Sequence, residues 1–315
     1  MRNKVLIPEI VVSAVALVIL ANSVRAQASK QQSKPAAIVN GIAISMAEVE
    51  QALKQAGPTA TPLTELQRKQ MRQEALSLLI DDILLQEHLR RHAPQVDPME
   101  VNKHLRELEQ GLQKQGKTLG SFCKETSQTE VQLRINLLNM LQWSAYVNQR
   151  LSEQEIKRYY EENKDFFDRV SLRVSHIVLR AGLPADSPDR RAARTKLETL
   201  RKDLVTGKLD FADAAKKFSQ DSSAASGGDI GYIPRKLAVD EEFAKAAFAL
   251  NVGEISQVVE TDYGLHLIKC TDRKPGQPSD YTKIKDEVRE FYIEEIRLGI
   301  IADERKSATI EINLP

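Results

Sequence analysis

The chain has 315 residues, of which 42% are hydrophobic and 28% are charged, a composition typical of globular proteins. At roughly 100–200 residues per domain, this length predicts two domains. The 45 Lys and Arg residues nearly balance the 44 Asp and Glu residues, which leaves a formal net charge of +1. This balance does not favour nucleic acid or an anionic membrane surface as the main partner.

Residues 1–28 have the pattern of a secretory signal peptide. A short basic region precedes an apolar run over residues 10–21, and Ala26 and Ala28 are the small residues that signal peptidase requires. The apolar run is short for a membrane span, which needs about 20 residues. We therefore expect cleavage near Ser29 and export to the periplasm, the cell envelope or the medium. An uncleaved signal is the alternative, and only then would the chain be held at a membrane.

Residues 29–168 are predicted to form a mainly helical, chaperone-like domain that opens with a hairpin. Residues 36–44 contain two apolar runs on either side of Asn40-Gly41, which is a strong signal for a tight turn. A long helical pattern covers residues 64–93. Further N-cap residues indicate helix starts at Asp97, Ser127 and Ser152.

Residues 169–275 are predicted to form a separate domain of mixed helices and strands. Residues 172–179 alternate between two faces with the period of two that is typical of a strand. Two later strand runs, over residues 255–259 and 265–271, are joined by a hairpin turn. The cysteines Cys123 and Cys270 fall in different predicted domains, so we expect both to be unpaired and buried.

Residues 276–315 are predicted to contain a C-terminal helix and a strand, after a polar linker over residues 274–279. A single terminal strand needs a partner, and the hairpin over residues 36–44 is the evident candidate. This pairing would complete the helical domain with residues 279–315. The mixed domain would then be an insertion in the helical one.

The mixed domain resembles the parvulin-type (rotamase, PpiC-like) peptidyl-prolyl cis–trans isomerases at several points, in the family's order. They are Ser175-His176-Ile177, Phe211 to Asp221, Gly227-Gly228-Asp229-Ile230-Gly231, Phe243 to Ser256, and Thr261 to Ile268. The whole chain is similar, with less specific motifs, to the secreted SurA/PrsA class of chaperone–isomerases. Those motifs are Val39-Asn40-Gly41, Tyr159-Tyr160-Glu161 and the helix after the mixed domain.

The resemblance implies an α+β fold. A four-stranded antiparallel sheet surrounded by helices would be inserted in, or would follow, a mainly α-helical domain. Parvulins often have Met where this chain has Leu237 or Val239, and some have Ser at Tyr263, so the shape of the proline pocket stays open. The site residues that the resemblance implies are catalytic His176, Asp221 and His266, and substrate-binding Leu237, Val239, Phe243 and Tyr263.

These residue types suit rotation about an X–Pro bond. The rotation crosses a barrier of about 18–20 kcal/mol, and no bond has to be broken. The reaction needs an apolar socket for the pyrrolidine ring and a few oriented polar groups in a dry pocket that stabilise the twisted amide. Phe243 can supply the socket, and the two histidines with Asp221 can supply the polarity. We therefore expect no cofactor and no metal.

The expected function is isomerisation of X–Pro bonds, together with chaperone activity, on unfolded or nascent exported polypeptides. The alternative is a non-catalytic chaperone that uses the parvulin-like domain as a peptide-binding platform. Two other clusters are given simpler interpretations. His88 and His92, one helical turn apart, could bind a metal but are read as a solvated face. A basic cluster after the first strand is read as surface charge, and not as a site for acidic residues; it contains Arg180, Arg190, Arg191 and Arg194.

Overall fold

The computed structural model describes residues 34–55, 64–126, 128–180 and 187–314. The chain divides into two compact units. The helical unit comprises residues up to Glu153 and from Arg289 onward, and the central unit comprises Gln154–Val288. The predicted signal peptide, residues 1–28, lies outside the described residues. Among the described helices, none is both long enough and apolar enough to cross a membrane.

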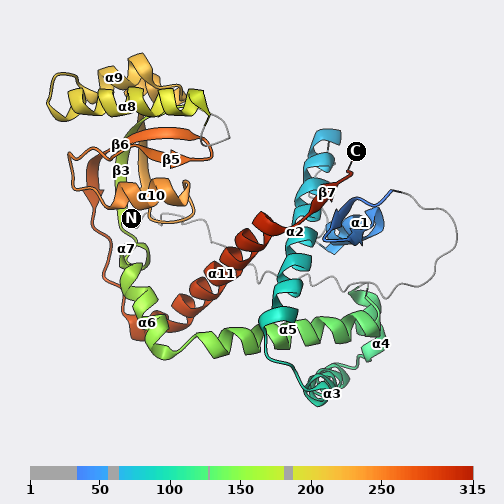
Figure 1. The fold of residues 1–315 in the computed structure, drawn as a ribbon. Coiled ribbons are helices and arrows are strands. Elements are labelled where there is room, and N and C mark those ends of the chain that lie inside the picture. Colours follow the sequence, from blue (N-terminus) through green and yellow to red (C-terminus); the bar gives the residue numbers. More distant parts are fainter. Residues whose placement is uncertain (1–33, 56–63, 127, 181–186, 315) are drawn as a thin grey trace, which may run out of the picture. The chain divides into compact units, whose positions relative to one another are not determined.

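A small antiparallel sheet joins the two ends of the chain in the helical unit (Figure 1). Its strand order is β2 (Ile42–Ile44), β1 (Ala37–Val39) and β7 (Ile310–Ile312). Asn40 and Gly41 form the turn with φ angles of 48° and 82°, the left-handed values that a type I′ turn requires. The predicted pairing of the terminal strand with this hairpin is confirmed.

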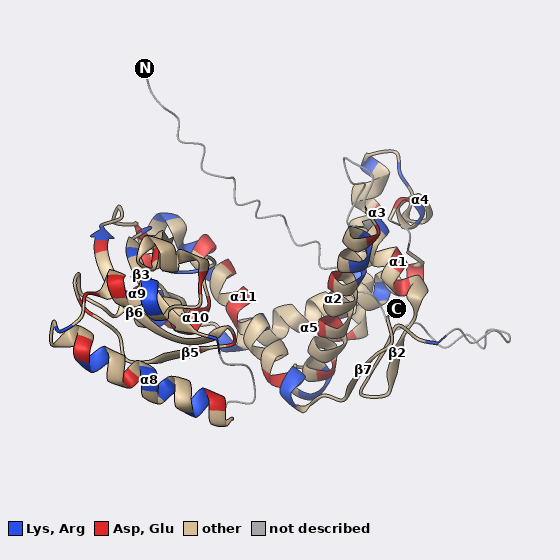
Figure 2. Ribbon diagram, turned by 90° about the horizontal axis from the view of Figure 1, so that it is seen from above, with Lys and Arg blue, Asp and Glu red and all other residues tan. Residues whose placement is uncertain are grey.

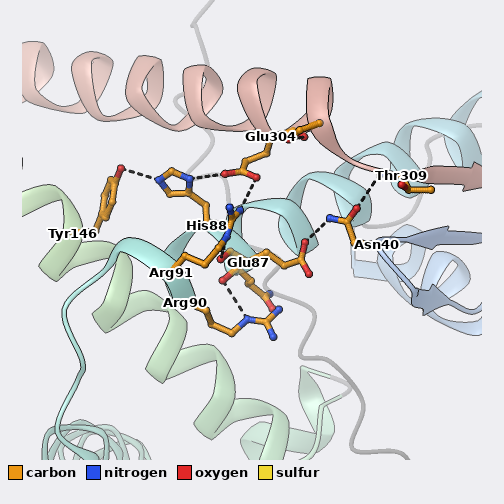
Figure 3. Close-up of polar contacts among 10 residues, drawn as sticks. Asn40, Glu87, His88, Arg90, Arg91, Tyr146, Glu304 and Thr309 are labelled. Atoms are coloured by element: carbon orange, nitrogen blue, oxygen red, sulfur yellow. Dashed lines mark hydrogen bonds and ion pairs between the residues drawn. The ribbon is translucent and has the colours of Figure 1, made fainter.

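The side chain of Asn40 adds two further bonds at this junction (Figure 3). Its amide nitrogen donates to Glu87 Oε2 at 2.6 Å, and its oxygen accepts from Thr309 N at 2.9 Å. Asn at this position therefore does more than allow a left-handed turn. It connects the hairpin both to the helix that carries Glu87 and to the C-terminal segment.

Helices make up the rest of the helical unit. They are α1 (Met46–Gln55), α2 (Glu65–His92), α3 (Pro98–Lys114), α4 (Leu119–Glu125), α5 (Glu130–Arg150) and the part of α11 (Tyr281–Ser307) from Arg289 onward. Asp97 caps α3 as predicted, with Pro98 in the first turn. The cap predicted at Ser127 lies outside the described residues and is not the N-cap of α5, which is Thr129, in a reciprocal capping box with Gln132.

Apolar faces hold the helices of this unit together. Leu76, Ile80 and Leu84 on α2 pack with Val39 and the rest of the hairpin. Farther along α2 the core continues against α5 and α11, through Leu85, Leu89, Tyr146, Val147 and Ile301. Cys123 is buried and free, as is Cys270 in the central unit, which confirms the prediction for both.

The central unit contains a four-stranded antiparallel sheet with the order β4-β3-β6-β5. The predicted α+β fold is confirmed. Its strands are β3 (Ser171–Leu179), β4 (Asp229–Pro234), β5 (Val259–Thr261) and β6 (Gly264–Lys274). Its helices are α6 (Glu153–Glu162), α7 (Lys164–Phe167), α8 (Pro188–Val205), α9 (Phe211–Phe218), α10 (Glu241–Phe248) and the short 3₁₀ helix η1 (Ser222–Ser226).

The two faces of this sheet carry different cores. Ile177 and Leu267 face α8 and α9, whereas Val174 and Ile268 face α10 (Figure 1). Because neighbouring residues of a strand point to opposite faces, the even-numbered residues of β3 and β6 share the α10 face. Lys and Arg are interspersed with Asp and Glu along the helices (Figure 2).

The segment predicted as a linker, residues 274–279, is bonded to the turn after α7. Gln277 N donates to Asp168 O at 2.8 Å, and Ser279 N donates to Asp168 Oδ1 at 2.7 Å. Tyr160 on α6 also donates its hydroxyl to Ser279 O at 2.8 Å. A Cβ on Gly276 would lie 1.6 Å from Asp168 O, so only glycine permits this approach. The polar residues and the glycine of residues 274–279 therefore dock this segment on Asp168, and do not make it a free linker.

Candidate active site

His176 on β3 and His266 on β6 lie on the α10 face of the central sheet. His176 is opposite Ile268 and His266 is opposite Val178, which sets the two imidazoles diagonally across the strand pair. Their Nδ1 atoms are 3.4 Å apart, and the two rings lie nearly parallel, 17° from coplanar. Both side chains are buried.

Phe243 closes the apolar side of this pair. Its ring meets His176 and His266 edge to face, at centroid distances of 5.7 Å and 5.4 Å. The residue is 4% exposed and belongs to the apolar cluster of the α10 face. Asp240, the N-cap of α10, accepts from Phe243 N and so fixes the start of the helix that carries the ring.

Asp221 approaches His176 from the loop after α9. Its Oδ1 lies 3.4 Å from His176 Nε2, and the same oxygen accepts from Ser223 N at 2.9 Å as the cap of η1. His176 Nε2 is also 3.2 Å from Ser223 Oγ. The glycine loop packs directly against the backbone of His176: His176 N donates to Gly228 O at 2.8 Å, and a Cβ on Gly228 would lie 2.3 Å from His176 O. Gly228 has a φ of 81°, which L-residues rarely adopt.

Thr261 completes the network on the other side. Its Oγ1 is 2.9 Å from His266 Nε2 and also accepts from Tyr263 N at 3.2 Å. Thr261 was not among the predicted site residues, although it opens the hairpin turn between β5 and β6. The available signal was local, since Thr before a tight turn often accepts a bond from the backbone two residues on. That bond leaves the hydroxyl proton free for His266.

Burial decides the charge of the histidines. It lowers the pKa of His176, and it lowers the pKa of His266 to about 4, helped by repulsion from His176. The Ser223 hydroxyl and amide hold the pKa of Asp221 well below its usual range. At neutral pH the site therefore contains two neutral imidazoles and one carboxylate.

One arrangement of protons satisfies every contact in this row. Thr261 donates to His266 Nε2, His266 Nδ1–H points to His176 Nδ1, and His176 Nε2–H points to Ser223 Oγ and Asp221 Oδ1. The polarity then runs in one direction and ends on the charged group. These side chains can present fixed dipoles to a bound amide when an apolar group attached to that amide packs against Phe243.

Comparison with known proteins identifies two regions of the chain. Residues 176–272 match the family described as PPIC-type PPIASE domain, and residues 1–131 match the SurA-like N-terminal domain. The foldase protein PrsA of Bacillus subtilis (strain 168) is 38% identical over 160 residues, which are 50% of this chain and 48% of that protein. The foldase protein PrsA of Caldanaerobacter subterraneus subsp. tengcongensis is 30% identical over 244 residues, 74% of this chain and 72% of that protein.

The chain belongs to the PrsA foldase family. It is also similar to the chaperone SurA of Photorhabdus laumondii, with 42% identity over 112 residues, 35% of this chain and 25% of that protein. The match to the Bacillus subtilis PrsA spans about half the length of that relative.

The substrate-binding residues predicted for this PrsA-family chain lie in different surroundings. Val239 packs against the cluster that contains Phe243. Leu237 adopts a left-handed φ of 72° and is 77% exposed, so it lies outside that cluster. Tyr263 is 48% exposed, with its ring 6.2 Å from that of His266. Of these two residues, Val239 therefore packs on the cluster of Phe243 and Leu237 does not.

The reading of the basic cluster as surface charge is wrong for one of its members. Arg190 is 4% exposed, and its guanidinium donates to Thr261 O at 3.2 Å and lies 3.3 Å from Glu260. Arg194 also pairs with Glu260. These arginines therefore tie α8 to β5, next to the residue that contacts His266.

The reading of His88 as part of a solvated face is also wrong. Its Nδ1 is 2.7 Å from Glu304 Oε1 and its Nε2 is 2.9 Å from Tyr146 Oη (Figure 3). Both ring nitrogens therefore have protein partners, drawn from α5 and α11. The sequence could not indicate this, because the partners are 58 and 216 residues away. His92, by contrast, is exposed.

Proposed function

We propose that the central unit catalyses cis–trans isomerisation of X–Pro peptide bonds. The observation that carries the proposal is the buried Phe243 ring set edge to face against two neutral histidines, with the Asp221 carboxylate beside them. The match of residues 176–272 to the PPIC-type PPIASE domain supports it. Val239 and Phe243 are the proposed apolar socket, and Tyr263 stands at its open side.

Twisting the X–Pro amide concentrates electron density on nitrogen and withdraws it from the carbonyl oxygen. In the proposed mechanism the ring of the proline is held on Phe243, while the fixed dipoles of the histidine row favour the twisted state over the planar one. The histidines act mainly by orientation, because their pKa values keep them neutral. Asp221 sets the direction of the row and supplies its one full charge.

The test is an isomerase assay on a prolyl peptide, coupled to a protease that cleaves only the trans form. Phe243→Ala removes about 2–3 kcal/mol of ring burial and should lower kcat/KM roughly 30- to 150-fold. Asp221→Ala should lower kcat more than it raises KM. His176→Ala should lower both activity and stability, since it leaves its partners without a hydrogen bond.

A matched pair of variants, in which either Val239 or Leu237 is replaced by alanine, tests the apolar socket in the same assay. Val239→Ala should raise KM for the prolyl peptide, whereas Leu237→Ala should match the wild type. If Phe243→Ala, Asp221→Ala and His176→Ala all retained wild-type kinetics, this pocket would not be the proline site. An inactive wild-type protein would favour the alternative, a chaperone that uses the central unit only as a peptide-binding platform.

We also propose that the chain is an exported foldase whose clients are unfolded polypeptides that contain X–Pro bonds. The SurA-like match over residues 1–131 and the foldase and chaperone names of the relatives support this. The signal pattern over residues 1–28 supports export to the periplasm or another part of the cell envelope. Expression with the native N-terminus, cell fractionation and N-terminal sequencing test it. A cytoplasmic protein that still starts at Met1 would contradict it.

A further inference from the structure

We propose that Tyr263 and Arg180 are positioning residues that orient the Asp221 carboxylate toward His176, and that Tyr263 acts on the reaction through Asp221. This inference rests on the proposed isomerase function and deepens it. It changes the role expected for Tyr263, which the resemblance implied to be a contact for substrate.

Tyr263 contacts three members of the candidate site. Its hydroxyl donates to Asp221 Oδ2 at 3.2 Å, and its ring lies 25° from parallel to that of His266. Its backbone N–H donates to the Thr261 hydroxyl that contacts His266. A single residue therefore touches both ends of the polar row that runs through the histidines.

Arg180 determines the direction of the Tyr263 hydroxyl. Its guanidinium donates from Nη2 to Tyr263 Oη and lies 4.8 Å from the ring centroid. Because Arg has only donors, the tyrosine oxygen must accept from it, and its one proton is left for Asp221. Arg180 is itself held by its backbone N–H, which donates to Gln220 Oε1 at 2.6 Å. Gln220 directly precedes Asp221 in the chain.

The two carboxylate oxygens of Asp221 are thus held separately. Oδ1 accepts from Ser223 N and faces His176, while Oδ2 accepts from Tyr263. A carboxylate fixed at one oxygen only can rotate about its last bond, which would turn the charge away from His176. Held at both oxygens, the group keeps one orientation, and the histidine row keeps its direction. Tyr263 then matters most in the twisted state of the amide.

The test compares Tyr263→Phe, which removes only the hydroxyl, with the wild type in the prolyl-peptide assay. One hydrogen bond to a partly exposed carboxylate is expected to be worth about 2- to 10-fold in kcat, with KM within about twofold. Arg180→Met should have a similar but smaller effect, and Arg180→Lys, which keeps a donor, should restore most of it. In an Asp221→Ala background, Tyr263→Phe should have no further effect.

Tyr232→Phe is the matched control, because Tyr232 also donates its hydroxyl to an aspartate, Asp272, in the same unit but away from the histidines. Its kcat should equal that of the wild type. A Tyr263→Phe variant that changed KM alone, or that lowered kcat equally with and without Asp221, would overturn the proposal.

A second measurement does not depend on activity. Carboxyl-carbon NMR titration should show a higher pKa for Asp221 in Tyr263→Phe than in the wild type, since a donor to the charged form is lost. Tyr232→Phe should leave the Asp221 pKa unchanged. An unchanged pKa in Tyr263→Phe would overturn the positioning role, even if the wild type proved inactive and the proposed function failed.

Discussion

Each unit contains a network in which a histidine faces a carboxylate, and the two networks differ in the lengths of their contacts. His88 lies between Glu304 and Tyr146 at 2.7 and 2.9 Å, and Arg91 also pairs with Glu304 at 2.6 Å (Figure 3). His176 lies between Asp221 and His266 at 3.4 Å each. The first network joins three helices by short bonds. The second is looser and borders the apolar ring of Phe243.

This difference shows that a histidine beside a carboxylate does not by itself make a site. Short bonds that use every donor and acceptor leave a histidine nothing to offer a ligand. The longer contacts of His176, beside the apolar ring of Phe243, leave its polar groups able to interact with a bound amide. The surroundings of the pair, and not its composition, separate a structural network from a candidate site.

The largest test of this comparison removes one partner of the helical network altogether. A chain that ends at Lys274 lacks α11 and β7, and with them Glu304 and the strand that pairs with β1. We expect the helical unit to lose its cooperative thermal transition, because apolar faces on α2 and α5 and the partly buried polar groups that contact α11 lose their partners. Circular dichroism during heating measures this. A soluble truncated protein with the native transition would contradict the shared construction of this unit.

The complementary fragment tests whether the central unit folds independently. The predicted limits of this unit are residues 169–275, but the bonds that join Asp168 to Gln277 and Ser279 lie outside them. We propose that both fragments fold, and that residues 154–288 melt roughly 5–10 °C higher than residues 169–275, since about 1–2 kcal/mol of hydrogen bonding is kept. Equal melting temperatures would show that the docked segment adds no stability.

A single substitution tests whether the His88 network has a structural role separate from isomerase activity. His88→Ala should lower the free energy of unfolding of the helical unit by about 1–3 kcal/mol, because Glu304 and Tyr146 lose a partner. Isomerase activity should stay at the wild-type level. His104→Ala is the matched control, since His104 pairs with Glu107 one turn along the surface of the same helix, and the change should cost less than about 0.5 kcal/mol. A loss of isomerase activity in His88→Ala would break the distinction between the networks.

The units should also respond to acid in opposite directions. His266 has its pKa lowered from 6.5 to about 4 by burial, so the unfolded chain gains a proton first and the central unit loses stability as the pH falls from 6.5 to about 4. Asp82 on α2 has its pKa raised from 3.8 to about 7 by burial, despite Arg297, so the folded chain holds the proton more tightly. The contribution of Asp82 therefore falls as the pH rises from 3.8 to about 7.

Asp82→Asn isolates the second effect. At pH 8 the variant should be more stable than the wild type by about 1–3 kcal/mol, because no charge has to be buried, and the two should converge near pH 4. Urea unfolding of the full chain at several pH values, followed by signals of each unit, gives the comparison. A difference between the two proteins that did not change with pH would contradict a raised Asp82 pKa.

The smallest expected effect concerns chaperone activity. Phe243→Ala should leave suppression of client aggregation unchanged, because we expect the helical unit to hold clients through its own apolar surface. Light scattering of an unfolded client, with wild type and variant at equal concentration, measures it. Equal loss of chaperone and isomerase activity would mean that one site performs both.

Local signals in the sequence predicted much of this fold. The Asn40-Gly41 turn, the Asp97 cap and the period-two strand over residues 172–179 depend on neighbours in the chain, and each is present. The start of α5 was missed because Ser127 and Thr129 both fit a cap pattern, and only the bonds formed decide between them. Family motifs, rather than periodicity, selected His176, Asp221 and His266.

The rest depended on contacts between distant residues. The docking of residues 274–279 on Asp168, the partners of His88 and the burial of Arg190 join segments that no local pattern connects. Thr261 was overlooked for a different reason: its local turn signal indicates the bond from Tyr263 N but not the contact with His266 across the hairpin. Tyr263 was selected, but its contact with Asp221 spans 42 residues and could not be read from the chain.

The pairing of β1 with β7 has a consequence for the order of events during synthesis. Ala37 has its strand partner at Ile312, so a chain that emerges N-terminus first presents β1 long before that partner exists. The central unit, continuous from Gln154 to Val288, has all of its strands available earlier. Until β7 appears, one edge of the hairpin is open to other strands. During that interval the growing chain is itself exposed to unwanted strand pairing, which is the hazard that a chaperone prevents in other chains.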